Sequence, residues 1–289
     1  MFLSKESFEF MISVFRLSCI LRALSVSATT LMFATLAHAD VSDGLVALDA
    51  GDIPTAAISF QNAFTTGDAD GAFYLGRLFE FGLGTEADLG RAANLYAAGA
   101  EAGSVLAMNR LALMYLNGVV LLRDYGEAAR LFCASADAGD VTGQLNCGLL
   151  YQAGRGVDAN PSEAVRYFEL AAAQGNVAAL NLLGQMLVSG SGVPADPERA
   201  RTLFTQTALA GNAVGLFELA QLSVAEDDLV QAYAYANLAT VRGHVAARAL
   251  RDELEAGMSA QDITSGQDLA RAWTASRISE RASATAVSE

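Results

Sequence analysis

The chain has 289 residues, and its 32 Asp and Glu outnumber its 18 Lys and Arg, which gives a formal net charge of −14 at pH 7. Such an acidic surface repels nucleic acid and anionic lipid, so it argues against both as partners. It favours a basic protein or a cationic ligand, or else serves solubility alone. Ala and Leu are abundant and prolines number only four, a composition that favours helices throughout.

Residues 1–39 have the pattern of a signal peptide. Three basic residues precede an uncharged apolar run over 24–36, namely Lys5, Arg16 and Arg22. The run ends in Ala37-His38-Ala39, the small-x-small pattern that signal peptidase reads. We therefore predict cleavage before Asp40 and a periplasmic or secreted protein with no stable membrane insertion. A retained membrane anchor is the alternative, although the run is short for a membrane span.

The rest of the chain repeats with a period of 36 residues, followed by one shorter step of 32. Glycine follows this register at Gly67, Gly103, Gly139, Gly175, Gly211 and Gly243. A second series, of Asp and Asn, keeps the same register at Asp52, Asp88, Asp124, Asn160, Asp196 and Asp228. A period in this range marks a repeat protein, in which one elongated array replaces separate globular domains.

The register sets the expected boundaries of the array. A degenerate helix pair at 40–67, with helices over 42–50 and 53–66, precedes five repeats. The repeats are 68–103, 104–139, 140–175, 176–211 and 212–243. Capping helices are expected at 244–275, because terminal units need an atypical outer face to end the stack in water. Residues 276–289 are rich in Ser, Ala and charge and predict a disordered tail.

Each repeat is predicted to be a pair of helices, as residues 140–175 illustrate. Leu145, Leu149 and Leu150 recur at helical spacing and predict a first helix, which Gly154-Arg155-Gly156 ends. Asn160-Pro161-Ser162-Glu163 then predicts the start of a second helix, in which the Asn side chain caps the helix and the Glu returns a bond to the cap backbone. Ser259-Ala260-Gln261-Asp262 resembles a similar capping box that opens the last helix.

Two further positions keep the register and predict how the helices pack. A small residue recurs on the first helices, at Gly76, Ala112, Gly148, Gly184 and Ala220. We expect it to allow the close approach of a neighbouring helix. An aromatic residue recurs on the second helices, at Tyr96, Phe132, Phe168 and Phe204, and is expected to be core packing instead of a ligand cage.

The repeat resembles a known family. Its motif runs Leu-Gly-x-x-Tyr, Gly-x-Gly-Val, a capping Asp or Asn with Ala four residues on, an aromatic pair, and Ala-x-x-Gly-Asn, best matched over 145–176 and 183–212. This pattern resembles the Sel-one-like repeat, a relative of the tetratricopeptide repeat. The resemblance implies an all-α fold, a right-handed α/α solenoid of antiparallel helix hairpins whose concave face holds peptides or other proteins. It also implies roles as adaptors and scaffolds in secretion, degradation and envelope signalling.

The residues that common catalytic or metal sites need are scarce in the predicted mature chain. Its only lysine, Lys5, lies in the presequence, so the Ser-x-x-Lys motif of penicillin-recognising enzymes is excluded. His244 is the one histidine after the presequence, and it follows Gly243 in a turn with no nucleophile elbow nearby. No clustered His and Cys residues offer a zinc site. We therefore expect no catalytic, cofactor-binding or metal-binding residues.

Cys133 and Cys147 form a candidate disulfide, because an exporting pathway permits oxidation. They lie symmetrically about the turn at Gly139-Asp140, so they can stand at the same height on two antiparallel helices. Their positions in the repeat argue against pairing. Cys147 stands where the other repeats have a core leucine, whereas Cys133 stands where they have either apolar or polar residues. Both the paired and the free state stay open.

One loop departs from the polar pattern. Val119, Val120, Leu121 and Leu122 replace the Gly-containing loop of the other repeats. An apolar run in a loop is either tucked into the protein or binds something. The second possibility makes these four residues a candidate partner contact.

We predict an exported, non-catalytic adaptor or regulator in the cell envelope, which presents a concave helical surface to another protein or peptide. The alternative is a binder of peptides or cell-wall polymer fragments, which an exposed line of Tyr and Asp residues would favour. An enzyme, such as a hydrolase, is a third class, and it needs a pocket with convergent polar groups.

Overall fold

The computed structural model describes residues 40–287, and the side chains of residues 40–276. The predicted signal peptide and its cleavage site near Ala39 lie outside the described residues. Within the described range the chain forms fourteen helices and no strands. They are α2 (Val41–Asp49), α3 (Ile53–Thr65), α4 (Asp70–Phe81), α5 (Leu89–Glu101), α6 (Val105–Asn117), α7 (Tyr125–Asp137), α8 (Val141–Ala153), α9 (Pro161–Ala173), α10 (Val177–Ser189), α11 (Pro197–Leu209), α12 (Ala213–Ala225), α13 (Leu229–Val241), α14 (Val245–Gly257) and α15 (Ala260–Val287).

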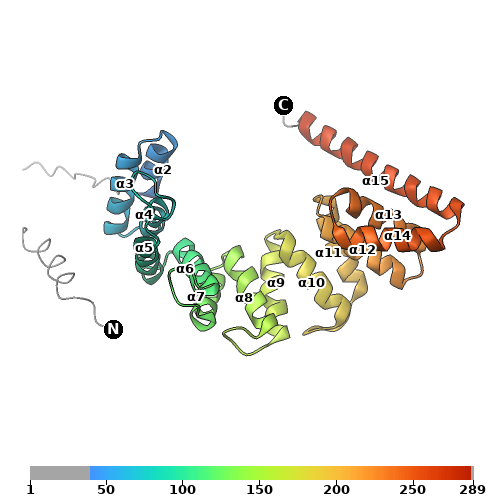
Figure 1. Ribbon diagram of the computed structural model, residues 1–289, viewed down its shortest axis with the longest axis horizontal. Coiled ribbons are helices and arrows are strands. Elements are labelled where there is room, and N and C mark those ends of the chain that lie inside the picture. Colours follow the sequence, from blue (N-terminus) through green and yellow to red (C-terminus); the bar gives the residue numbers. More distant parts are fainter. Residues whose placement is uncertain (1–39, 288–289) are drawn as a thin grey trace, which may run out of the picture. The chain divides into compact units, whose positions relative to one another are not determined.

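The helices pack in chain order. Each helix from α2 to α13 packs on the next, so that the array is a series of antiparallel hairpins (Figure 1). The predicted all-α solenoid is confirmed. Among the described helices, none combines the length and the apolar character that crossing a membrane requires.

The turns between hairpins use the glycines of the 36-residue register. Gly139 has φ of 91° and Gly175 has φ of 80°, left-handed values that glycine adopts without strain. From Gly103 onward, the residue that follows each glycine of the register caps the next first helix. Asp140 does so by accepting the Gly143 N–H at 2.7 Å, and Asn176 does so by accepting the Ala179 N–H at 2.9 Å.

The loop inside each hairpin is hydrogen-bonded both to the helix that precedes it and to the helix that follows it. The side chain of Asn160 accepts the Glu163 N–H at 3.2 Å, as predicted. Its backbone N–H, however, donates to Tyr151 O on the preceding helix at 3.0 Å. The predicted return bond from Glu163 is therefore absent, because its partner is already engaged, and the Glu163 carboxylate pairs with Arg166 at 2.9 Å. The equivalent caps are tied in the same way, by Asp88 to Phe79, Asp124 to Tyr115 and Asp196 to Leu187.

The small residue on the first helices makes room chiefly for an aromatic ring of the second helix. A Cβ added to Gly148 would lie 2.6 Å from a ring carbon of Phe168, and one added to Gly76 would lie 2.7 Å from a ring carbon of Tyr96. Both rings belong to the second helix of the same hairpin and are fully buried. The predicted small residue on the first helix and the predicted aromatic residue on the second helix are therefore in contact with each other.

The C-terminal end differs from the prediction. Ser259 caps α15 as expected, since its Oγ accepts the Asp262 N–H at 3.2 Å. The helix then continues to Val287, through most of the segment 276–289 that the sequence predicted to be disordered. Gly266 is the last glycine and no proline follows it, so nothing in the remaining sequence breaks a helix that has already begun.

Candidate interaction surface

Two neighbouring loops expose large apolar side chains to solvent. They are the α4–α5 loop, together with Phe81 at the end of α4, and the α6–α7 loop. The exposed fractions are 56% for Phe81, 39% for Leu83, 50% for Val119, 52% for Val120 and 91% for Leu122. We call these five residues the apolar edge.

The repeat register explains why the two loops share one side of the solenoid. Leu83 and Val119 are 36 residues apart, so they occupy the same position in successive hairpins. The same position holds Arg155 and Ser191 in the next two hairpins. The apolar character is therefore confined to the first two of these loops.

Val120 has an unusual backbone conformation. Its φ of 68° is left-handed, whereas the equivalent residues of the other three loops are glycines, Gly84, Gly156 and Gly192, with φ between 73° and 76°. A β-branched residue in this region costs about 1–3 kcal/mol. Strain of this kind persists only where the surroundings impose it, and it is concentrated at functional sites.

The glycine loops also pack closely against the preceding hairpin. A Cβ added to Gly156 would overlap the carbonyl oxygen of Tyr125, and one added to Gly192 would overlap the backbone of Pro161. A valine cannot make that approach, so Val120 presents its side chain to solvent. Only Leu121 packs on the core. Of the four apolar residues of the α6–α7 loop, Leu121 alone is tucked into the protein.

A polar network fixes the helices beneath the apolar edge. The Glu80 carboxylate accepts the Tyr96 hydroxyl at 2.6 Å and Arg110 Nε at 3.0 Å, which joins α4, α5 and α6. Burial raises the pKa of Tyr96 above its ordinary value, so the phenol stays protonated and donates. Arg77 lies over the ring of Phe81, 4.6 Å from its centroid. A rigid support of this kind lowers the entropy lost when a partner binds.

Sequence reasoning missed Phe81 and Leu83. The available signal was the register itself, because Leu83 aligns with Val119. It was overlooked because the α4–α5 loop keeps the expected Gly-x-Gly, which made it resemble the polar loops.

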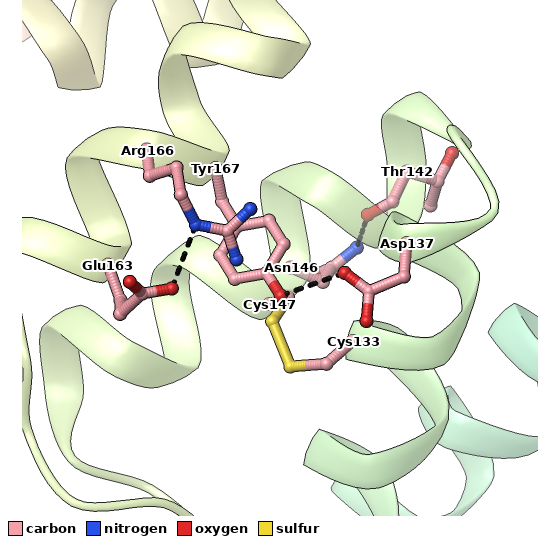
Figure 2. Close-up of a disulfide and its surroundings, with 8 residues drawn as sticks. All are labelled: Cys133, Asp137, Thr142, Asn146, Cys147, Glu163, Arg166 and Tyr167. Atoms are coloured by element: carbon pink, nitrogen blue, oxygen red, sulfur yellow. Dashed lines mark hydrogen bonds and ion pairs between the residues drawn. A yellow bond between two sulfur atoms is a disulfide. The ribbon is translucent and has the colours of Figure 1, made fainter.

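Cys133 and Cys147 are joined in a disulfide, with their Cα atoms 5.0 Å apart (Figure 2). Cys147 is fully buried, and Cys133 is only partly buried, as their positions in the repeat predicted. That difference does not keep them apart. Because α7 and α8 are antiparallel, the two side chains meet across the helix contact at equal distance from the turn.

The side chains around the disulfide tie α9 to α7. The Tyr167 hydroxyl donates to Asp137 at 3.2 Å, and the Arg166 guanidinium lies 4.0 Å from the Tyr167 ring centroid (Figure 2). Burial raises the pKa of Tyr167, which keeps the donor protonated. This cluster strengthens three consecutive helices and is structural in character.

His244 has a structural role. Nδ1 of His244 accepts the Ala247 N–H at 3.2 Å as the cap of α14, and its ring stacks on Phe217 at 4.4 Å. Over the described part of the chain, no group of three His, Cys, Asp or Glu side chains is placed to hold a metal ion.

Four segments of the chain match the family model described as Sel1 repeat, at residues 69–104, 105–140, 141–176 and 177–212. No curated protein matches the chain. Among solved structures it is similar to a protective antigen of uropathogenic Escherichia coli that displays an SLR fold. The TM-score is 0.68 and the identity 22%, over 79% of this chain and 53% of the antigen. This chain therefore spans about half the antigen's length.

A second similar structure is a Sel1 repeat protein from Oxalobacter formigenes. The TM-score is 0.66 and the identity 23%, over 72% of this chain and 87% of that protein. At such identities the likeness establishes the fold.

Proposed function

Since residues 69–212 are four Sel1 repeats and the chain is a Sel1 repeat protein, we propose that it is an exported, non-catalytic adaptor that binds another protein in the cell envelope. Sel1 repeat proteins generally mediate protein–protein interactions and are typically non-catalytic scaffolds. The finer assignment to export and to the envelope is our proposal, and so is the site at which the partner binds.

One observation carries the proposed binding site. The apolar edge combines exposed apolar side chains with a left-handed backbone at Val120. The three other loops of the same length use glycine at this position. Burial of the apolar side chains by a partner would therefore give the strained conformation of Val120 a function. Apolar surface removed from water contributes about 25 cal/mol per Å².

The test of the site is a triple substitution, Val119→Ser, Val120→Ser and Leu122→Ser. Leu121 is left unchanged because it packs on the core. The matched control substitutes three exposed apolar residues elsewhere, Val46→Ser, Ile58→Ser and Val245→Ser. Affinity capture from envelope extracts with quantitative mass spectrometry should show one protein retained by the wild type and the control and lost with the triple variant.

Two outcomes of this experiment count against the proposal. One is that no protein is retained above background. The other is that the triple variant retains the same protein as strongly as the wild type does, while circular dichroism shows that all three proteins are folded.

The proposed absence of catalysis is supported by the role of His244, whose Nδ1 is engaged in capping α14. The alternative of a cell-wall polymer binder would be favoured by an exposed line of Tyr and Asp residues. All eight tyrosines of the chain are buried or partly buried, and Tyr96 and Tyr167 serve the core. A protein partner is therefore the better proposal.

The proposed export is supported by the presequence pattern of residues 1–39 and by the disulfide, because disulfides persist in oxidising compartments. Fractionation of producing cells, with N-terminal sequencing of the purified protein, tests it. We expect the protein in the periplasm or medium, beginning at Asp40. A cytoplasmic protein that retains residues 1–39 would contradict this part of the proposal.

A further inference from the structure

The last hairpin of the solenoid is splayed. In every earlier hairpin the two helices pack directly on each other, whereas α15 packs on α13, and α14 packs on α13 from another side. Figure 1 shows α15 beside α13 and α14 at the C-terminal end. The space between α14 and α15, above α13, is an open groove of about 760 Å³. This volume is in the range of ligand-binding sites, about 300–1,000 Å³.

The groove has an apolar floor and a cationic rim. Tyr233, Leu238 and Ala270 are buried and form the floor. Each of the three surrounding helices contributes an arginine to the lining, namely Arg242 at the end of α13, Arg251 on α14 and Arg271 on α15. Among the side chains that the structure describes, Glu255 is the one acidic residue in the lining. Asn237, Gln267 and Thr274 add hydrogen-bonding groups.

The three guanidinium groups are available to a ligand. Arg242 donates to the backbone carbonyl of Leu238 at 3.2 Å, and no carboxylate among the described side chains 40–276 pairs with it. Arg251 pairs with Asp252 and Arg271 with Asp268, and both acids lie outside the groove lining. The Arg271 pair, with side chains 66% and 65% exposed, contributes little to stability, so a carboxylate from a ligand replaces it at low cost. Arg251 is 26% exposed and Asp252 is 58% exposed, so a ligand has to compete with Asp252 for this guanidinium.

Because the chain as a whole is acidic, the groove with its three arginines is a place where an acidic ligand can bind. The net charge is −14, so an acidic ligand is repelled by most of the surface. Arginine binds carboxylates through paired, charge-assisted hydrogen bonds, and the apolar floor accommodates one or more aliphatic or aromatic side chains. The groove is open and too small for a folded domain, and its dimensions suit a short segment of extended or helical chain.

We infer that the groove between α14 and α15 binds an acidic peptide segment of a protein partner, with carboxylates on Arg242, Arg251 and Arg271 and an apolar side chain on the floor. This inference names the chemistry of a partner and so rests on the proposed function. It uses none of the residues of the apolar edge, and the two sites are separable by substitution.

The probe is a library of random peptides displayed on phage and selected on the full chain. The test variant is Arg242→Gln, Arg251→Gln and Arg271→Gln. The matched control is Arg91→Gln, Arg130→Gln and Arg199→Gln, which removes the same charge from three exposed arginines elsewhere. Peptides enriched on the wild type and the control should carry clustered Asp and Glu beside an apolar residue and should be lost on the test variant.

Fluorescence anisotropy with an enriched peptide then measures affinity. The test variant should bind at least about tenfold more weakly, since three charge-assisted contacts are removed. Replacing the peptide's acids by amides should have a similar effect. The variant Leu122→Ser should bind this peptide as the wild type does. If the triple variant fails to fold, Arg271→Glu alone, at a side chain 66% exposed on α15, tests the same contact.

The inference is overturned if the enriched peptides carry no excess of acidic residues, if no peptide is enriched, or if the test variant binds with unchanged affinity. Failure of peptide binding while the apolar edge still retains its protein partner would reject the groove alone. Failure of both would reject the proposed function as well.

Discussion

At the residue scale, capping side chains do more than end helices. Asp140 accepts the Gly143 N–H at 2.7 Å, the buried Asn109 Nδ2 at 2.7 Å and Ser135 Oγ at 3.2 Å. The first bond caps α8, and the second joins it to the preceding first helix. A single carboxylate thus stabilises one helix and the contact between two repeats.

Asp140→Ala should lower the free energy of unfolding by about 2–4 kcal/mol, because it removes a cap and leaves buried donors unsatisfied. Asp140→Asn should cost much less, since Asn212 caps α12 and accepts from Asn181 at the equivalent place. Urea denaturation measures both. Asp158→Ala, in an exposed loop, is the neutral control, and an equal loss in all three variants would refute the assigned role.

The disulfide should contribute strongly to the free energy of unfolding. Replacing Cys133 and Cys147 by Ala should cost about 3 kcal/mol, the expected effect of closing a loop of this length, given their separation of 14 residues. Reductant should destabilise the wild type by a similar amount and leave the variant unaffected. Two free thiols in denatured, unreduced protein would show that the bond does not form.

Tyr96 makes stability depend on alkaline pH. Burial raises its pKa in the folded protein above the ordinary value of 10.0. Its contribution is therefore complete below about pH 10 and is lost as the pH rises above that value, where the unfolded chain ionises first. Tyr96→Phe, the residue found at the equivalent positions 132, 168 and 204, should lose less stability between about pH 8 and about pH 11. Urea denaturation across this range measures it, and an identical alkaline loss in both proteins would contradict the prediction.

At the element scale, a loop and the helix that follows it form one unit. The backbone N–H of each cap residue donates to the preceding helix, as Asn160 does to Tyr151 O. The loop length is therefore constrained from both ends. The α6–α7 loop keeps this bond, from Asp124 to Tyr115 O at 3.1 Å, while it accepts a valine where glycine is preferred.

Val120→Gly should stabilise the protein by about 1 kcal/mol, because the left-handed conformation at φ 68° costs glycine little. The reverse change, Gly156→Val, should destabilise it by more than about 2 kcal/mol, since the added Cβ overlaps Tyr125 O. Thermal unfolding of the two variants compares them directly. A destabilised Val120→Gly would mean that the valine is held by native contacts and is not strained.

At the scale of the whole molecule, the repeats are interchangeable units. Deleting residues 176–211 joins Gly175 to Asn212 and recreates the Gly-Asn junction that already exists at Gly175-Asn176. Leu216 and Leu219 then take the places of Leu180 and Leu183, all of them buried. The register predicts that α9 packs on α12 as it did on α10.

This deletion variant should fold cooperatively with a smaller urea m-value, because less surface is exposed on unfolding. Circular dichroism and urea denaturation measure both properties. Deletion of residues 176–193, which removes one helix out of register, is the control and should abolish cooperative unfolding. Equal behaviour of the two deletions would show that the repeat is not the folding unit.

The helices, their caps and the solenoid architecture could be predicted because they depend on local chemistry repeated in register. The residues that escaped prediction depend on neighbours distant in sequence. Gly148 was assigned to close helix packing, although the ring of Phe168 lies over it. Phe81 and Leu83 escaped notice because exposure, and not residue type, makes them part of a surface.

The amino-acid sequence by itself determined the period, the pairing of helices and the positions of the turns, because caps, glycines and apolar spacing act over a few residues. Only the tertiary structure decided that Cys133 meets Cys147, that the α6–α7 loop faces solvent and that α15 leaves α14 to pack on α13. These features depend on which surfaces compete for burial, and that competition is settled only when all the helices are in place.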